Sequence, residues 1–287
     1  MRSKKTVIFL TIGFLIGVCV LLYPAFSSYV NSKTQTRAIV NYESVLQQMA
    51  PEDYSAIFQA AYDYNNALLE LSYPLRDYEE VPGYFETLSI PGGDIMGYVI
   101  IEKIGVELPL YHGTSDEVLS RGVGHLQGSS LPVGGPSTHS VMSAHRGLPN
   151  AKLFTNLDRL EVGDTFKISI LDQVLTYQVD QVKVILPNEI EDLHIVEGKD
   201  YCTLFTCTPY GINTHRLLVR GIRIETIVEK PVIYVSNDAF RIEPIMVTPA
   251  VAAPMLLVLL IHLMVKYRTP DDKTQEKKKK GDTSNAP

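Results

Sequence analysis

Two apolar runs of about 20 residues near the two ends of the chain limit how it can fold. The first covers residues 6–26 and the second covers residues 245–265, and each is long enough to cross a bilayer as a helix. Lys and Arg residues cluster before the first run and after the second, and such clusters favour the cytoplasmic side. We therefore expect residues 1–5 and 266–287 in the cytoplasm, with everything between the two runs outside the membrane.

The charge of the chain follows the same division. The net charge is −6, but residues 24–244 hold 16 basic and 28 acidic residues, whereas the two flanks hold 10 basic and 4 acidic residues. An acidic exported segment argues against a nucleic-acid partner, and the basic tail fits a membrane-side anchor. Ala25-Phe26-Ser27 also has the form of a secretory cleavage site, and of the two interpretations we favour an uncleaved anchor.

The segment after the first apolar run predicts helices followed by a long connection. Residues 32–49 and 52–71 have helical patterns that are separated at Pro51. The second helix has an apolar stripe made of Tyr54, Ile57, Phe58, Ala61, Tyr62, Leu68 and Leu69. This helical segment, residues 27–71, forms a stalk or packs on the domain that follows, and both alternatives stay open. Residues 72–88 are rich in Pro, Gly and Tyr, which is typical of a lid or a linker.

Short strands dominate the chain from Gly97 onward. Runs of β-branched and aromatic residues between turn residues predict eight strands, which suggests a closed β-barrel. The strands are expected at residues 97–101, 106–112, 123–127, 139–145, 165–171, 174–185, 201–207 and 216–225. Short helices are expected at residues 114–119 and 153–160. The barrel domain then covers residues 89–227, and residues 228–244 link it to the second apolar run.

The last two strands place a thiol beside a cation. Turn residues separate these strands, so the hairpin brings Cys207 close to Arg216. A cationic neighbour can favour the thiolate, and a guanidinium can donate hydrogen bonds to an oxyanion on a carbonyl that the sulfur attacks. Cys202 should point to the opposite face of the same strand, into the core, and no disulfide is expected. An unpaired cysteine in an exported protein indicates a reactive thiol.

Acyl transfer also needs a proton shuttle, a role that imidazole suits near neutral pH. His145 ends a predicted strand, where its side chain can reach the rim of a cleft. His139 points the same way but lies six residues, roughly 20 Å, further down the strand. His262 lies in the second apolar run and His215 should face away from Arg216. Turn or surface positions are expected for the remaining three, which are His112, His125 and His194.

The motifs around these residues resemble those of the sortases, which are cysteine transpeptidases of Gram-positive cell surfaces. Thr203-Leu204-Phe205-Thr206-Cys207, with Arg216 downstream, resembles the sortase active-site signature. Thr138-His139-Ser140-Val141-Met142-Ser143-Ala144-His145-Arg146-Gly147 resembles the sortase histidine motif. Residues 131–135 and 171–179 resemble class C sortases, the members of the family that assemble pili. The resemblance extends over about residues 89–227.

The resemblance implies a mostly β fold, namely a closed eight-stranded sortase-type barrel with short helices, an N-terminal helical segment and two flanking transmembrane helices. It implies that the catalytic residues are His145, Cys207 and Arg216. Further residues would support the motif or bind substrate, namely Thr203, Thr206 and Ala144. No cofactor and no metal are expected.

The implied reaction is the transfer of a surface protein to an amine. Cys207 would attack the carbonyl after Thr in a Leu-Pro-x-Thr-Gly-like sorting signal and form a thioester. A lysine of a pilin subunit is the expected acceptor, whereas a housekeeping-type sortase would use an amine of a cell-wall precursor. A papain-like protease is a poor fit, because there the cysteine opens a helix and precedes its histidine. The non-enzymatic alternative is an exported β-barrel scaffold in which Cys207 and Arg216 are structural.

Class C sortases carry a lid at the position of residues 72–88, and an Asp-Pro-aromatic triplet typically places it over the active site. This chain has no such triplet. Tyr73-Pro74 or Asp77-Tyr78 could occupy the cleft in a different way. The alternative for this segment is a plain linker.

Overall fold

The computed structural model describes residues 4–226, 252, 254–258 and 261 of the chain. By its contacts the chain divides into two units, Met1–Ser27 with Tyr234–Pro287 and, as the second, Ser28–Ile233. Helix α1 (Lys4–Leu46) begins in the first unit and continues into the second.

In the first unit, α1 exposes large apolar side chains, among them Phe9, Val20 and Phe26. The helix is long and apolar enough over Thr11–Leu46 to cross a membrane, as its length and composition show. Most of the second predicted span, residues 245–265, lies outside the described residues, and the described positions within it are helical. The second span and the orientation in the membrane therefore stay predictions.

In the second unit, the end of α1 and the whole of α2 (Pro51–Leu69) pack on the barrel. The hydroxyl of Tyr42 donates to the carbonyl oxygen of Met96 at 2.8 Å and accepts from the amide of Leu171 at 2.8 Å. Of the two alternatives for this helical segment, the structure shows the packed one. The predicted apolar stripe of α2 is partly wrong, because Tyr62 and Leu69 are exposed. The buried face of α2 consists of Phe58, Ala61, Tyr64, Asn65 and Leu68.

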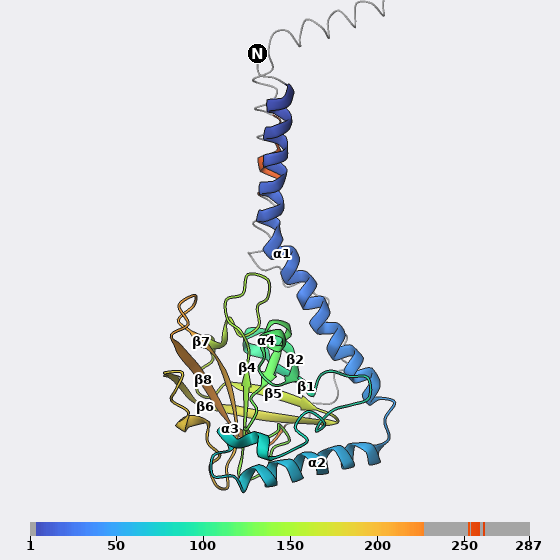
Figure 1. The fold of residues 1–287 in the computed structure, drawn as a ribbon, viewed down its shortest axis with the longest axis vertical. Coiled ribbons are helices and arrows are strands. Elements are labelled where there is room, and N and C mark those ends of the chain that lie inside the picture. The colour runs from blue at the N-terminus through green and yellow to red at the C-terminus, as the bar shows by residue number, and fades with distance from the viewer. Residues whose placement is uncertain (1–3, 227–251, 253, 259–260, 262–287) are drawn as a thin grey trace, which may run out of the picture. The chain divides into compact units, whose positions relative to one another are not determined.

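Eight strands form a closed barrel, as predicted (Figure 1). Around the barrel their order is β1, β2, β3, β4, β7, β8, β6, β5. The pairs β2–β3 and β4–β7 are parallel and the other pairs are antiparallel. The strands are β1 (Gly97–Ile101), β2 (Val106–His112), β3 (Val123–His125), β4 (Thr138–Ser143), β5 (Thr165–Ile170), β6 (Gln173–Ile185), β7 (Asp200–Thr208) and β8 (His215–Ile224).

Two sequence-based boundaries need correction. β4 ends at Ser143, so His145 lies in the loop after the strand and not at its end. The predicted helix at residues 153–160 is only a 3₁₀ turn at Leu157–Arg159. The other short helices are α3 (Pro74–Asp77) and α4 (Asp116–Arg121), with 3₁₀ turns at Tyr78–Glu80, Glu102–Ile104 and Glu191–Leu193.

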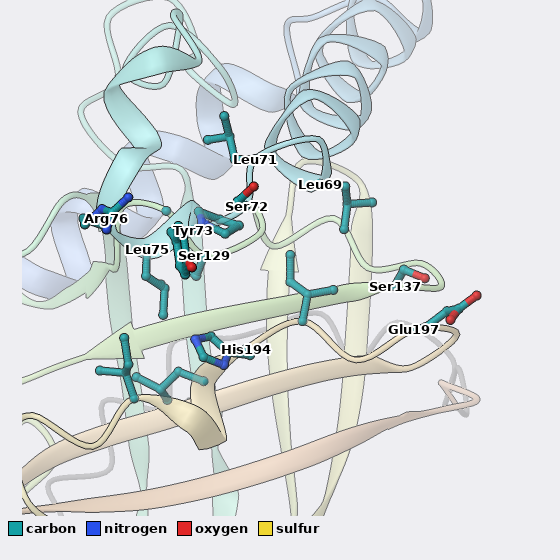
Figure 2. Close-up of a pocket in the computed structure, with 15 residues that line it drawn as sticks. Leu69, Leu71, Ser72, Tyr73, Leu75, Arg76, Ser129, Ser137, His194 and Glu197 are labelled. Atoms are coloured by element: carbon teal, nitrogen blue, oxygen red, sulfur yellow. The ribbon is translucent and has the colours of Figure 1, made fainter.

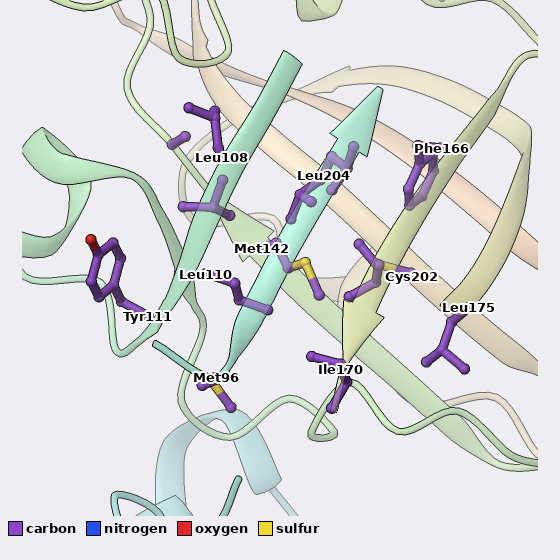
Figure 3. Packing of buried hydrophobic residues seen from close by; sticks show 14 of the residues in the cluster. Met96, Leu108, Leu110, Tyr111, Met142, Phe166, Ile170, Leu175, Cys202 and Leu204 are labelled. Atoms are coloured by element: carbon purple, nitrogen blue, oxygen red, sulfur yellow. The ribbon is translucent and has the colours of Figure 1, made fainter. Parts of the chain in front are cut away.

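The barrel interior is filled by one apolar cluster, of which Figure 3 shows the centre. Met142 of β4 and Leu204 of β7 are buried in it next to Cys202. Cys202 is fully buried, as the sequence predicts from its offset to Cys207, and burial raises the pKa of its thiol. Residues of β7 therefore alternate between this interior and the outer face, which carries Thr203, Phe205 and Cys207.

Candidate active site

The hairpin of β7 and β8 sets the position of the candidate nucleophile. Cys207 lies directly opposite Arg216 in the antiparallel register, which confirms the predicted pairing. Residues paired in this way have Cβ atoms only about 5 Å apart on the same face of the sheet. Both residues are half-buried, so a substrate can reach them. A thiol and a guanidinium therefore lie side by side on an accessible strand end.

The parallel pair of β4 and β7 leads the chain toward Cys207 just before His145. Ser143 pairs with Phe205, and the same offset of 62 residues, continued past the end of β4, would bring His145 level with Cys207. Beyond the end of β4, the amide of Ala144 donates to the Phe205 carbonyl at 3.4 Å. The Thr206 hydroxyl in turn donates to the Ala144 carbonyl at 2.8 Å. These bonds extend the ladder by one residue and fix the backbone just before His145.

A second contact holds the chain just after His145. The Arg146 guanidinium lies 3.4 Å from the Thr208 hydroxyl and makes an ion pair of 2.6 Å with Asp158. The Arg146 side chain is only 11% exposed, so this pair is better shielded from water than an ordinary surface ion pair. The residues on both sides of His145, Ala144 and Arg146, are thus bonded to the residues on both sides of Cys207, Thr206 and Thr208. Nothing in the sequence reasoning assigned this role to Arg146.

Arg216 is held by the loop between β7 and β8. Its Nη1 donates to the carbonyl oxygens of Asn213 at 3.2 Å and of His215 at 3.1 Å. A guanidinium has five N–H donors, so these two bonds leave the donors on Nε and Nη2 for a substrate oxygen. The loop therefore fixes one edge of the fork while the rest of the guanidinium remains able to bind an oxyanion.

An apolar patch continues from Cys207 along the outer face of the sheet. Phe205 lies opposite Leu218 in the register, and Leu218 packs in a small buried cluster. We call this cluster the groove floor; it consists of Val141, Ile185, Leu193 and Leu218, with Phe205 packed against it. The four members are buried, and Phe205 is half-buried on the face that carries Cys207.

One residue of the predicted lid, Leu75 in α3, packs on the groove floor. Gly128 lies under the same segment: a Cβ at this position would come within 2.5 Å of the Pro74 carbonyl oxygen and 2.7 Å of Leu75 Cα. The lid residues predicted from the sequence were Tyr73, Pro74, Asp77 and Tyr78. Leu75 directly follows Pro74 and so has the position of the aromatic residue in the Asp-Pro-aromatic triplet of class C sortases. This position could have identified Leu75 from the sequence.

Of the four residues proposed for the lid, Tyr73 and Pro74 line the cavity described below, and Tyr73 and Asp77 both contact Arg76. The Arg76 guanidinium lies 4.5 Å from the centre of the Tyr73 ring and forms two hydrogen bonds to Asp77, of 2.6 and 2.8 Å. Tyr73 is 60% exposed, and Tyr78 packs against the main core cluster. No residue between 72 and 80 is fully buried.

The second half of the connection, residues 81–88, is fixed in the core. Tyr84 is buried, and its hydroxyl accepts from the Gly113 amide at 2.9 Å and lies 2.9 Å from Nδ1 of His125. The carbonyl oxygen of Thr87 bonds Nε2 of His112 at 2.7 Å, and Leu88 is fully buried. Within the predicted lid at residues 72–88, residues 72–80 are therefore the part that contains no buried residue.

A cavity of about 630 Å³ adjoins the groove floor (Figure 2). One side is formed by residues 69–76, and the facing side by the connection between β6 and β7, residues 186–199, which contributes Ile190, Leu193, His194, Ile195 and Glu197. Ser129 and Ser137 line the remaining wall, as the close-up shows. The cavity is largely apolar, which suits side chains of a peptide.

Three further histidines, His112, His125 and His139, are held inside the fold. His125 is fully buried, so its predicted turn or surface position is wrong, and burial lowers its pKa to about 4. His112 is partly buried and burial lowers its pKa as well. His139 is 1% exposed, and Thr203, which was predicted to support the motif, contacts its Nε2 at 2.7 Å. Among the described residues, no group of His, Cys, Asp and Glu is arranged to hold a metal ion.

Comparison with known proteins identifies the family. The model of the sortase domain matches residues 99–224. A crystal structure of sortase C1 from Streptococcus agalactiae is 49% identical, covers 66% of this chain and 99% of that protein's chain, and superimposes with a TM-score of 0.60. Sortase C from Streptococcus pneumoniae is 43% identical over 66% of this chain and 97% of its own, with a TM-score of 0.60.

Curated relatives match over a shorter stretch. Sortase D of Bacillus subtilis is 28% identical over 135 residues, which is 46% of this chain and 65% of that protein. The match thus spans slightly less than two thirds of the length of this relative. From the barrel, its motifs and the 99% coverage of sortase C1, we conclude that the chain belongs to the sortase family of cysteine transpeptidases and is most like its class C members.

Proposed function

We propose that this protein cleaves a Leu-Pro-x-Thr-Gly-like sorting signal after Thr and transfers the carboxyl group to an amine. The observation that carries the proposal is the pairing of Cys207 with Arg216 across β7 and β8. The β4–β7 register, continued past Ser143, supports a place for His145 near the same end of the barrel. A nucleophile, a proton shuttle and an oxyanion donor would then meet there.

Each residue has a defined task in the two half-reactions. The Cys207 thiolate attacks the Thr carbonyl carbon, and the oxyanion that forms accepts hydrogen bonds from Arg216. The C–N bond to Gly breaks as protonated His145 gives its proton to the leaving amine, which leaves a thioester on Cys207. The second amine then loses a proton to His145 and attacks the thioester, so a new amide forms and the thiolate is released. One peptide bond is exchanged for another.

The acceptor that we propose is a lysine of a pilin subunit, and the alternative is an amine of a cell-wall precursor. The pilin proposal is supported by likeness to class C sortases, including the pneumococcal sortase C that has been described for its pilin substrate specificity. We also propose that the protein is membrane-anchored with its barrel outside the cell. The long apolar helix α1 supports the anchor.

Residues 72–80 act in this proposal as a weakly held lid over the groove. Leu75 packs on the groove floor, whereas the carboxylate of Asp77 bonds Arg76 of the same segment. A covered state that is only slightly favoured reduces the apparent affinity by a small factor. The lid should therefore gate the site by a few-fold only.

The experiment that tests the reaction offers both amines at once. The detergent-solubilised full chain is mixed with a sorting-signal peptide, a candidate pilin and a wall-precursor amine, and mass spectrometry identifies the thioester and the amide. We expect a thioester on Cys207 and an amide to the pilin lysine. Cys207→Ala should abolish both products, and Cys202→Ala should retain them. An active Cys207→Ala variant would show that the nucleophile is assigned wrongly.

The same experiment separates the proposal from its alternatives. An amide formed only with the precursor amine would show a housekeeping-type sortase. A folded protein that forms no thioester with any signal peptide, and whose Cys207 resists a thiol reagent, would support a structural scaffold.

A further inference from the structure

His139 is a buried histidine that the proposed reaction does not use. It lies on β4 on the same face as Val141, but it pairs with Tyr201, six residues from Cys207 along β7. At about 3.3 Å per residue this distance is roughly 20 Å, too far for proton transfer to the leaving amine. Its side chain is 1% exposed, and burying an imidazole has a free-energy cost unless its nitrogens are bonded.

Both ring nitrogens of His139 are bonded to parts of the groove. Nδ1 lies 2.9 Å from the carbonyl oxygen of His194, so Nδ1–H donates this bond. Nε2 then carries no proton and accepts from the Thr203 hydroxyl at 2.7 Å. The imidazole thus joins the connection at residues 186–199 to the floor strand β7. Burial lowers the pKa of His139 to about 4, so this neutral form with one N–H persists at neutral pH.

The connection that His139 holds forms one wall of the cavity. Leu193, next to His194, belongs to the groove floor, and both residues line the cavity (Figure 2). Asp192 also ties this connection to β6, with bonds of 2.6 Å to Lys183 and 3.4 Å to Gln181, and the Gly198 amide donates to the Ser137 hydroxyl at 2.9 Å. Lys183 is 49% exposed, and such an ion pair contributes little in water. His139 is thus a buried side chain that tethers this wall.

We propose that His139 is a positioning residue for the sorting signal: it holds residues 186–199 at the distance from the groove floor that a peptide needs. The inference rests on the proposed function, because it assigns a role in binding the substrate of that same site. His139 touches neither Cys207 nor Arg216, and its loss should leave the chemistry intact. A loosened wall should weaken binding of the peptide without slowing the bound peptide's reaction.

Two amide substitutions separate the two ends of the ring. In His139→Asn the side-chain amide nitrogen falls near the place of Nδ1 and can still donate to the His194 carbonyl. In His139→Gln the amide falls near the place of Nε2 and can bond Thr203 but not His194. We expect His139→Gln to raise KM for a sorting-signal peptide about tenfold, the size of one lost hydrogen bond, with kcat within about twofold. His139→Asn should stay within about threefold of the wild-type KM.

A matched control is His112→Asn, whose amide falls near the place of Nδ1 and therefore removes the bond from Nε2 to the backbone carbonyl of Thr87. Thr87 lies outside the cavity wall, so KM should not change. If His139→Gln folds poorly, Thr203→Val supplies a milder test, since it keeps the side-chain shape and removes the hydroxyl that bonds Nε2. It should raise KM by about threefold, again with kcat unchanged.

Hydrogen exchange tests the same inference without any substrate. In the full-length protein, His139→Gln should speed exchange of the amides at residues 190–197 and leave β7 and β8 unchanged. Wild-type exchange in that segment, a wild-type KM, or a fall in kcat at unchanged KM would each overturn the proposal. If the wild-type protein turned over no peptide, the proposed function would fail, and the exchange rates alone would decide whether His139 holds the wall.

Discussion

The two sides of the cavity beside the groove floor are attached to the barrel in different ways. Residues 186–199 are tied to it by a bond from the buried His139 ring and place Leu193 in the floor. Residues 72–80 contain no buried residue and contribute only Leu75 to the same floor. One side is thus a fixed wall and the other a weakly held cover. This difference predicts that the wall sets which peptide binds, whereas the cover changes how often the site is open.

The same difference divides the connection between α2 and β1. Residues 81–88 are anchored by Tyr84 on His125, and residues 72–80 are not anchored in this way. Buried histidines therefore hold both fixed parts, His139 the wall and His125 the second half of the connection. Four predictions test this contrast, from the largest expected effect to the smallest.

Acid should release both anchored parts at once. Burial lowers the pKa of His125 and of His139 to about 4, whereas an unfolded histidine titrates near 6.5. The unfolded chain therefore binds protons first, and the free energy of unfolding falls as pH drops from about 6.5 to about 4. A shift of this size is worth roughly 3 kcal/mol per histidine.

Urea unfolding of the detergent-solubilised chain at pH 7, 5.5 and 4 measures this effect. The charged groups around His139 are Arg220, Asp180 and His194, and His112 lies near His125. The variants His125→Gln and His139→Gln should each flatten the dependence of stability on pH. An equal slope in the wild type and in both variants would show that neither histidine is held neutral by the fold.

Arg216→Lys tests the geometry at the barrel end. Lysine keeps the positive charge but loses the planar fork, so turnover should fall by a factor on the order of 10² if Arg216 binds the oxyanion. The control is Arg220→Lys on the same strand, whose guanidinium bonds Asp180 and not the site. Near wild-type turnover in Arg216→Lys would show that Arg216 contributes only its positive charge and not directed hydrogen bonds.

Thr206→Val tests the bond that fixes the backbone just before His145. The Thr206 hydroxyl is buried and donates to the Ala144 carbonyl, and valine has nearly the same shape. We expect kcat to fall by about tenfold, because one lost hydrogen bond shifts the shuttle. Thr176→Val is the matched control, since its buried hydroxyl has no hydrogen-bond partner in the described part of the chain. Equal kcat values for the two variants would remove this role from Thr206.

Gly128→Ala should lift the cover and change accessibility by only a few-fold. Its new Cβ would collide with the backbone of Pro74 and Leu75, whereas Gly135→Ala adds a Cβ in open space at a similarly positive φ. The rate of thiol labelling at Cys207 reports the change, in a Cys19→Ser background because Cys19 is exposed. Leu75→Ala should act in the same direction.

The size of the labelling effect decides between three descriptions of residues 72–80. A few-fold increase fits a weakly held lid. An increase of a hundredfold or more would show a firm lid, and an unchanged rate would leave a plain linker. Substitution is sharper than deleting residues 72–88, since deletion would also remove Tyr84 and Leu88 from the core.

The sequence by itself determined the barrel, its strands to within about two residues, and the pairing of Cys207 with Arg216. These features depend on local patterns: alternating apolar residues, turn residues and a short hairpin between neighbouring strands. The same parity argument placed Cys202 in the core. The motif wording also singled out His145, although its strand ends two residues earlier than predicted.

Only the tertiary structure decided how distant segments meet. The parallel pairing of β4 with β7 joins residues 62 apart, and no local pattern specifies its register. Three further features depend on how the barrel closes through this pairing. They are the burial of His125, the bond from His139 to His194, and the contact of Leu75 with the groove floor. A side chain is functional or structural according to what packs on it, and for His139 and His145 that difference comes from segments far away in the chain.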